Sequence, residues 1–226
     1  SKESFVENVI KSCNELQNTI LSKYGKKYEQ GFFINGWYDF EDQGEKFQDK
    51  ILDAIINQRN FTFSFTGISN TAGHDNLFSQ SYPVVFGEIM GPIFSSAGIN
   101  INTRNGAMGN TDFYPYSWCV EDHAGSNADV ISWEMSMQVP DHQCNDTASM
   151  VESWVRMAVK LPSQPVPVLL NCRPSNAKCS PQYQWKYHSH NIFEKVIGRC
   201  DKTSNAHEIS LWYKEYGLHS LSLEDL

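Results

Sequence analysis

The sequence predicts an α/β fold: a three-layer α/β/α sandwich with a parallel, flavodoxin-like sheet, preceded by an N-terminal helical extension. Short apolar and β-branched runs alternate along the 226 residues with longer segments of helical periodicity. Strands separated by helices pair in parallel through right-handed crossovers, which places helices on both faces of the sheet. A chain of this length can bury a core of its own. We divide it into an extension, residues 1–58, and an α/β domain, residues 59–226.

The extension is expected to contain two helices. Residues 4–21 and residues 45–57 carry apolar side chains at three- and four-residue spacing, which is typical of amphipathic helices. Residues 31–40 between them are aromatic and interrupted by glycine, so we expect a loop or a short strand that packs on the domain. The first helix precedes the α/β core, and we assign to it the docking of a protein partner, should the domain belong to a larger assembly.

The domain is expected to alternate between strands and helices. The strand pattern, short and rich in apolar and β-branched residues, occurs at residues 61–66, 99–104, 129–135, 166–170 and 219–223. Helical spacing occurs at residues 82–94, with an interruption at Gly91-Pro92, and at residues 147–160, 192–196 and 206–216. Prolines ahead of residue 166 separate a helix from the strand that follows it.

Ser69 is the first candidate for a functional residue. The apolar run that begins at Phe61 stops abruptly at Gly67-Ile68-Ser69, and small polar residues follow. In an open α/β sheet, ligands bind beyond the carboxyl ends of the strands, so a serine in this turn can face a substrate as a nucleophile. The alternative is that Ser69 caps the next helix, because serine at a helix start satisfies free backbone N–H groups.

Three segments in order resemble the SGNH (GDSL-like) hydrolase family, and the resemblance covers residues 61–226. Gly67-Ile68-Ser69 matches the block with the catalytic serine. Residues 104–110 resemble the block with a glycine, and residues 129–138 resemble the block with an asparagine. The resemblance implies an esterase in which Ser69 attacks an acyl carbon. It also implies an oxyanion hole made by the backbone N–H groups of Ser69 and Gly109 and by the side chain of Gln138.

The chain departs from the family pattern at several positions. Ile68 stands where the family usually has aspartate, Ser136 replaces a glycine, and Gln138 replaces the asparagine, which shifts the side-chain N–H donor by one methylene. The closing Asp-x-x-His, which supplies the base in this family, does not occur up to Leu226. We expect that element either to lie further along the gene product or to have been lost.

Several other residues are candidates for contact with a substrate or for the role of base. We assign His74, five residues after the serine, and Asn105 to substrate binding. His74 is a weak candidate for the base because a catalytic triad takes its base from another loop. His188, His190 and His219 are the remaining alternatives.

Two further groups of residues were weighed. The aromatic segment 114–119 can stack on sugar rings or acyl groups, or can be buried as packing. Glu134, Asp141 and His142 have the spacing of neither a metal site nor a catalytic carboxylate pair, so we interpret them as structural. The sequence predicts no metal site and no cofactor, since no segment has the glycine spacing of a dinucleotide-binding loop.

Composition limits the partners and the compartment. A net charge of −8 and the lack of clustered Lys and Arg argue against a nucleic-acid partner, and no apolar run is long enough for a membrane span. Six cysteines without zinc-type spacing favour disulfides, with Cys172 and Cys179 as the most plausible local pair. Two sequons, at Asn60 and Asn145, are glycosylation candidates. Together these features predict a secreted or lumenal protein.

Two functions from different classes fit the sequence. The first is an SGNH-like serine esterase that hydrolyses a small-molecule or carbohydrate ester, such as an O-acetyl group, through an acyl-serine intermediate. The alternative is a catalytically inactive SGNH-like domain that serves as a binding or structural module in an extracellular or lumenal assembly. The order of Ser69 and Gly109 favours the enzyme, whereas Gln138 and the missing Asp-x-x-His favour the module.

Overall fold

The computed structural model describes residues 2–25, 37–38, 43–111, 113–134, 153–171, 184–185, 195–196 and 219–222. None of the helices within these ranges is long and apolar enough to cross a membrane.

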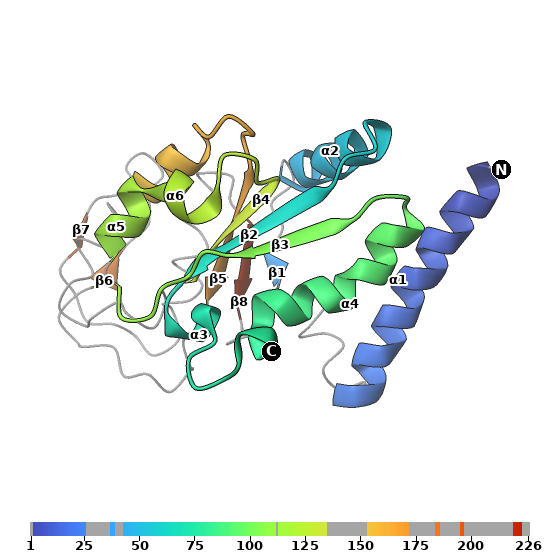
Figure 1. The fold of residues 1–226 in the computed structure, drawn as a ribbon, viewed down its shortest axis with the longest axis horizontal. Helices are drawn as coiled ribbons and strands as arrows, with labels where there is room; N and C mark the ends of the chain where they lie inside the picture. Colours follow the sequence, from blue (N-terminus) through green and yellow to red (C-terminus); the bar gives the residue numbers. More distant parts are fainter. Residues whose placement is uncertain are drawn as a thin grey trace.

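One six-stranded sheet forms the centre of the described structure, with the strand order β1-β8-β5-β4-β2-β3 (Figure 1). All neighbours from β3 to β8 pair in parallel, and β1 joins the edge of β8 antiparallel. The strands are β1 (Trp37–Tyr38), β2 (Phe61–Gly67), β3 (Ile101–Asn105), β4 (Val130–Glu134), β5 (Val166–Asn171) and β8 (His219–Ser222). Counted along the chain, the five parallel strands have the order 2-1-3-4-5, which is the flavodoxin-like arrangement that the sequence predicts.

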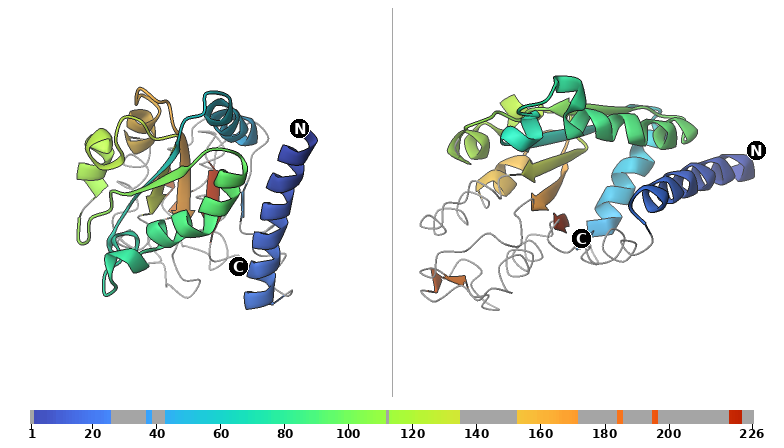
Figure 2. Two further views of the ribbon diagram at one scale, coloured as in Figure 1. Left: turned by 45° about the vertical axis from the view of Figure 1, so that its right-hand side comes forward. Right: turned by 90° about the horizontal axis from the view of Figure 1, so that it is seen from below.

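Helices cover both faces of the sheet, which completes the expected three layers (Figure 2). One face carries α4 (Tyr82–Ser96), with α1 (Lys2–Tyr24) along it, and α2 (Gln43–Ile56). The other face carries α5 (Phe113–Trp118), α6 (Val120–Ala124) and a helix at residues 153–158, where Trp154 packs on Trp133 of β4 at 5.0 Å between ring centroids.

The apolar core lies between the sheet and the first of these faces. Phe61 of β2 is fully buried and contacts Phe47 of α2 and Phe94 of α4, at 6.1 and 5.2 Å between ring centroids. Val9 of α1 packs against the same cluster. Residues of the N-terminal extension therefore contribute to the core of the α/β domain, and β1 contributes an edge to its sheet. The expected boundary between residues 58 and 59 stays a prediction.

The strands begin and end within about two residues of their predicted positions, but two helix predictions are wrong. The helix α4 runs without interruption through Gly91-Pro92 to Ser96. Proline removes only one backbone hydrogen bond, and the packing of Phe86 on β2 and of Phe94 on Phe61 holds the helix on both sides of it. Residues 195–196, expected to be helical, form β7 (Lys195–Val196), which pairs antiparallel with β6 (Gln184–Trp185). A pairing between distant segments is invisible to local periodicity. The expected helix at residues 206–216 lies outside the described residues.

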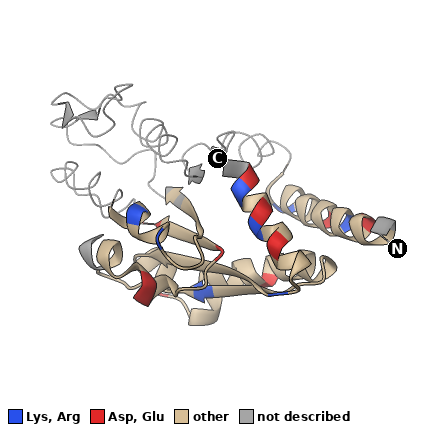
Figure 3. Ribbon diagram, turned by 90° about the horizontal axis from the view of Figure 1, so that it is seen from above, with Lys and Arg blue, Asp and Glu red and all other residues tan. Residues whose placement is uncertain are grey.

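Charged residues of both signs are spread along α1 and α2 (Figure 3). One of the basic residues, Arg59, makes a structural contact. Arg59 joins α2 to the sheet, since its guanidinium donates to Asp129 Oδ2 at 2.9 Å and its Nε donates to Asp53 Oδ2 at 2.9 Å. Asp129 is almost completely buried and also accepts from the backbone N–H of Thr62 at 2.8 Å. The hydrogen bond from Arg59 lowers the pKa of Asp53, and the hydrogen bond to Asp129 raises the pKa of Arg59.

We expect Arg59→Met to lower the free energy of unfolding at pH 7 by about 1–3 kcal/mol, because Asp129 loses a charged partner in a buried site. The pKa of Asp53 is depressed in the folded protein, so its contribution is present above the unfolded-state pKa and is lost as the pH falls below about 4. The difference between wild type and variant should therefore shrink in acid. Urea unfolding at pH 7 and at pH 3 measures both values; an equal difference at the two pH values would contradict this account.

Candidate functional site

Ser69 lies directly beyond the carboxyl end of β2, as the first residue of the short helix α3 (Ser69–Ala72) (Figure 1). The N-cap position is Ile68, which is buried, and no side chain caps this helix. The alternative interpretation of Ser69 as a helix cap is therefore wrong. Its side chain is half-buried, and its backbone carbonyl accepts a hydrogen bond from the N–H of His74 at 2.9 Å.

The turn that presents Ser69 requires glycine at position 67. A Cβ atom at Gly67 would lie 2.2 Å from Thr71 Oγ1 and 2.9 Å from the backbone oxygen of Glu134. The N–H of Ile68 donates to that same oxygen at 3.2 Å, so the chain stays attached to β4 up to the residue before Ser69. The glycine lets α3 fold back closely over the end of the sheet.

The segment after β3, residues 106–109, is attached to the end of β2 by backbone hydrogen bonds. Gly106 donates to the carbonyl of Phe65 at 2.9 Å, and Met108 donates to the carbonyl of Gly67 at 3.2 Å. Gly106 is sterically required, because a Cβ there would lie 2.1 Å from the backbone oxygen of His123. The hydrogen bonds continue the parallel pairing of β2 and β3 beyond the strands themselves.

This attachment brings the second predicted block against the first. A Cβ built on Gly109 would lie 3.7 Å from Ser69 Cβ, so the two residues are in van der Waals contact range. Gly109 does not have a positive φ, which removes the interpretation that it is glycine for the sake of a left-handed turn. The two residues that the sequence predicts as nucleophile and oxyanion donor are thus neighbours at the carboxyl edge of the sheet.

Tyr116 supports this segment from the side. It is fully buried, and its hydroxyl accepts a hydrogen bond from the N–H of Met108. Burial raises the pKa of Tyr116 to about 12, against the smaller effect of that hydrogen bond, so the hydroxyl is neutral at physiological pH. His123 packs on its ring at 4.4 Å between centroids, and burial lowers the pKa of His123. Tyr116, weighed at first as a sugar platform, is a packing residue, whereas Trp118 of the same segment is 65% exposed.

Asn105 and His74, predicted to contact substrate, have other contacts in the structure. Asn105 donates through Nδ2 to the carbonyl of Thr71 at 2.9 Å and accepts through Oδ1 from the N–H of Ala107 at 3.1 Å. It therefore connects α3 to the segment after β3. The His74 side chain is 68% exposed, and its Nδ1 lies 3.1 Å from Asp75 Oδ2. Contact of either side chain with a substrate stays a prediction.

The other predicted site residues are described only in part. Asn60 is exposed at the start of β2, and modification of it stays a prediction. The described structure includes only the backbone of His219, in β8. Gln138, Asn145, Ser136, Asp141, His142, His188 and His190 lie outside the described residues. Cys13 and Cys119 are free and exposed, and the four other cysteines, including Cys172 and Cys179, also lie outside the described residues.

Sequence reasoning assigned no role to Thr71 and too small a role to Glu134. Thr71 was not assigned because a buried polar side chain follows no periodic pattern. Glu134 was interpreted as structural, and its signal was a charged residue at the end of a strand whose every residue is buried. Within the described ranges, no group of His, Cys, Asp and Glu has the arrangement of a metal site.

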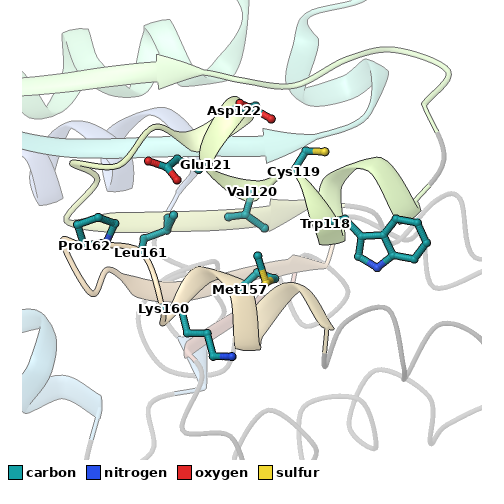
Figure 4. A pocket seen from close by; sticks show the side chains of 9 residues that line it. All are labelled: Trp118, Cys119, Val120, Glu121, Asp122, Met157, Lys160, Leu161 and Pro162. Atoms are coloured by element: carbon teal, nitrogen blue, oxygen red, sulfur yellow. The ribbon is translucent and has the colours of Figure 1, made fainter.

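A pocket of about 260 Å³ opens between α6 and the helix at residues 153–158 (Figure 4). Trp118 and Cys119 lie at one end of it and Leu161 and Pro162 at the other, with Lys160 along its side. Neither Ser69 nor Gly109 is among its lining residues, so this pocket is not the cavity around the serine.

Comparison with solved structures shows the fold. A two-domain esterase (CEX) active on acetylated mannans is similar over 84% of this chain, with 16% identity and a TM-score of 0.60. Its complex with mannopentaose gives 13% identity and a TM-score of 0.55 over 79% of the chain. AlinE4, an SGNH-hydrolase family esterase, is similar over 73% of this chain and 76% of its own, with 13% identity and a TM-score of 0.47.

This chain spans less than half the length of the two-domain esterase, 44% and 42% in the two structures. The TM-scores of 0.60 and 0.55 show a shared α/β/α fold, and at identities this low they show the fold alone. No protein-family model matches the sequence, and no curated protein matches it.

We expect Gly106→Ala to be more damaging than Gly109→Ala. The methyl group at position 106 meets a backbone oxygen, and overpacking of this kind costs about 1–3 kcal/mol. The methyl group at position 109 meets Ser69 only at ordinary contact distance, so stability should change by less than about 1 kcal/mol. Urea unfolding of both variants compares the two values, and equal losses would show that the segment does not lie as described.

Proposed function

We propose that this protein is an SGNH-like serine esterase that uses Ser69 as its nucleophile and removes O-acetyl groups from a carbohydrate. The observation that carries the proposal is the proximity of Ser69 and Gly109 at the carboxyl edge of the sheet, where ligands bind in open α/β folds. These residues belong to two segments that resemble separate blocks of one family and that are distant in sequence.

The reaction assigns a role to each group. Ser69 Oγ attacks the acyl carbon and passes its proton to a base; the sugar oxygen then leaves with a proton, and the acetyl group stays on the serine. In the second half, the base takes a proton from water, whose oxygen attacks the acyl carbon. The bond to Ser69 Oγ then breaks, so that acetate leaves and Ser69 recovers its proton. The backbone N–H groups of Ser69 and Gly109, with the side chain of Gln138, stabilise the oxyanion that forms in each half.

The proposal takes the base from a loop other than the one that carries Ser69, as in a catalytic triad. Of the histidines whose side chains are described, His74 lies beside Asp75 and His123 packs on Tyr116. The candidates that remain are His188, His190, His219 and a histidine outside this chain's 226 residues.

The substrate class rests on the nature of the structural neighbour. The fold is shared with an esterase that acts on acetylated mannans. The proposal includes a secreted or lumenal location, with glycosylation at Asn60 and Asn145 and disulfides among the cysteines outside the described residues. A soluble glycan substrate and a secretory route are consistent with one another.

The test is labelling of the intact protein with a fluorophosphonate, followed by peptide mapping. A fluorophosphonate reacts with a serine only when a base and an oxyanion hole activate it, so wild type should be labelled at Ser69 and Ser69→Ala should not be labelled. Ser126→Ala, which removes an exposed serine after α6, is the matched control and should be labelled like wild type. Wild type and Ser126→Ala should also release acetate from acetylated mannan, and Ser69→Ala should not.

Failure of the folded, full-length wild type to be labelled would overturn the esterase proposal. It would leave the catalytically inactive module as the function of this domain. Labelling without acetate release from acetylated mannan would retain the esterase and overturn the substrate class.

A further inference from the structure

Glu134 is a carboxylate buried without any exposed surface at the carboxyl end of β4. The strand is otherwise made of Val130, Ile131, Ser132 and Trp133, all of which are also buried. Taking a carboxylate out of water costs several kcal/mol unless hydrogen bonds replace its hydration. A glutamate at this position therefore has to be held by specific partners.

Thr71 of α3 is such a partner. Its Oγ1 donates to Glu134 Oε2 at 3.0 Å and lies 2.9 Å from the hydroxyl of Tyr82, the first residue of α4. The threonine hydroxyl has a single proton, which it donates to Glu134, so Thr71 accepts from Tyr82. The result is a directed chain from Tyr82 through Thr71 to Glu134.

Thr71 is also held through its backbone and by its fit to the strand below. Asn105 Nδ2 donates to its carbonyl at 2.9 Å, and the missing Cβ of Gly67 makes the space that Oγ1 occupies. Contacts from β2, β4, α4 and the end of β3 thus converge on one residue, two residues after Ser69 in a helix of four residues. A helix this short has little internal stability, so outside contacts set its orientation.

We infer that Glu134 is a positioning residue for the nucleophile: through Thr71 it fixes the rotation of α3 and so keeps Ser69 against Gly109. This inference rests on the proposed esterase function. It gives a function to a buried carboxyl group, since the hydrogen bond that offsets the cost of its burial also holds Thr71 in place. A serine displaced by about 1 Å from its reacting geometry loses on the order of 10²-fold in rate.

The test compares three variants that each alter one member of the chain: Thr71→Val, Glu134→Gln and Tyr82→Phe. The readouts are kcat and KM for 4-nitrophenyl acetate and the rate of fluorophosphonate labelling at Ser69. We expect Thr71→Val to lower kcat and the labelling rate by roughly 10–100-fold with KM changed less than about twofold, because the serine is moved while the binding surface is kept. Glu134→Gln keeps an oxygen acceptor for Thr71, so its loss should be smaller.

Coupling is the readout that a merely structural role would not produce. Because Glu134 acts through Thr71, the double variant Thr71→Val, Glu134→Gln should lose little more than Thr71→Val alone. Thr62→Val makes the same change in a buried threonine at the other end of β2 and should leave kcat within about twofold of wild type. Urea unfolding of each variant reports the folded fraction at the assay temperature.

Each outcome decides the matter. A wild type that is not labelled refutes the esterase proposal itself. If the wild type is labelled, three results overturn the positioning role alone. They are an unchanged kcat in Thr71→Val, losses that only follow the folded fraction, and additive losses in the double variant. If Thr71→Val and Glu134→Gln do not fold, Tyr82→Phe decides, because it removes only the outer hydroxyl of the chain: a fall in kcat of threefold or more at unchanged KM supports the role, and an unchanged kcat overturns it.

Discussion

The site depends on the absence of a side chain at Gly67. Because nothing projects from this position, Thr71 reaches over the end of β2, and its hydroxyl comes within hydrogen-bond distance of Glu134 on the neighbouring strand. Any larger residue would separate α3 from β4 and remove the partner of a buried carboxylate. One steric constraint therefore sets both the path of the chain after the strand and the polar contacts under it.

The end of β2 organises the site through its backbone. Its last carbonyls, at Phe65 and Gly67, accept from Gly106 and Met108, while the N–H of Ile68 donates to Glu134. Backbone groups lie in positions that the sheet ladder dictates, so the segments carrying Ser69 and Gly109 inherit the geometry of parallel pairing. The side chains of Tyr116 and Asn105 then stabilise the two segments from outside.

Periodicity predicted the parallel sheet, because a buried strand is recognisable from its own run of apolar and β-branched residues. It failed where distant residues decide: at residues 195–196, which pair with another segment, and at Gly91-Pro92, where packing on β2 outweighs a local helix breaker. The sequence predicted Ser69 from the end of a strand and Gly109 from a resemblance to a family, and the structure brings these two residues together. Thr71 could not be found in this way, because its importance arises from the convergence of four elements that are far apart along the chain.

The two ends of β2 have opposite chemistry, and the contrast explains how the fold tolerates a buried polar site. At Phe61 the strand packs among aromatic rings from α2 and α4, and this apolar burial supplies stability. At Thr66 and Gly67 the neighbours are hydroxyl, carboxylate and peptide groups that are costly to bury unless each is paired. Substitutions along the apolar end change how firmly the sheet is held without moving the serine. Substitutions at Gly67 or Gly106 move the segments themselves, since Ser69 follows β2 directly in the chain and the segment that carries Gly109 is attached to β2 by backbone hydrogen bonds.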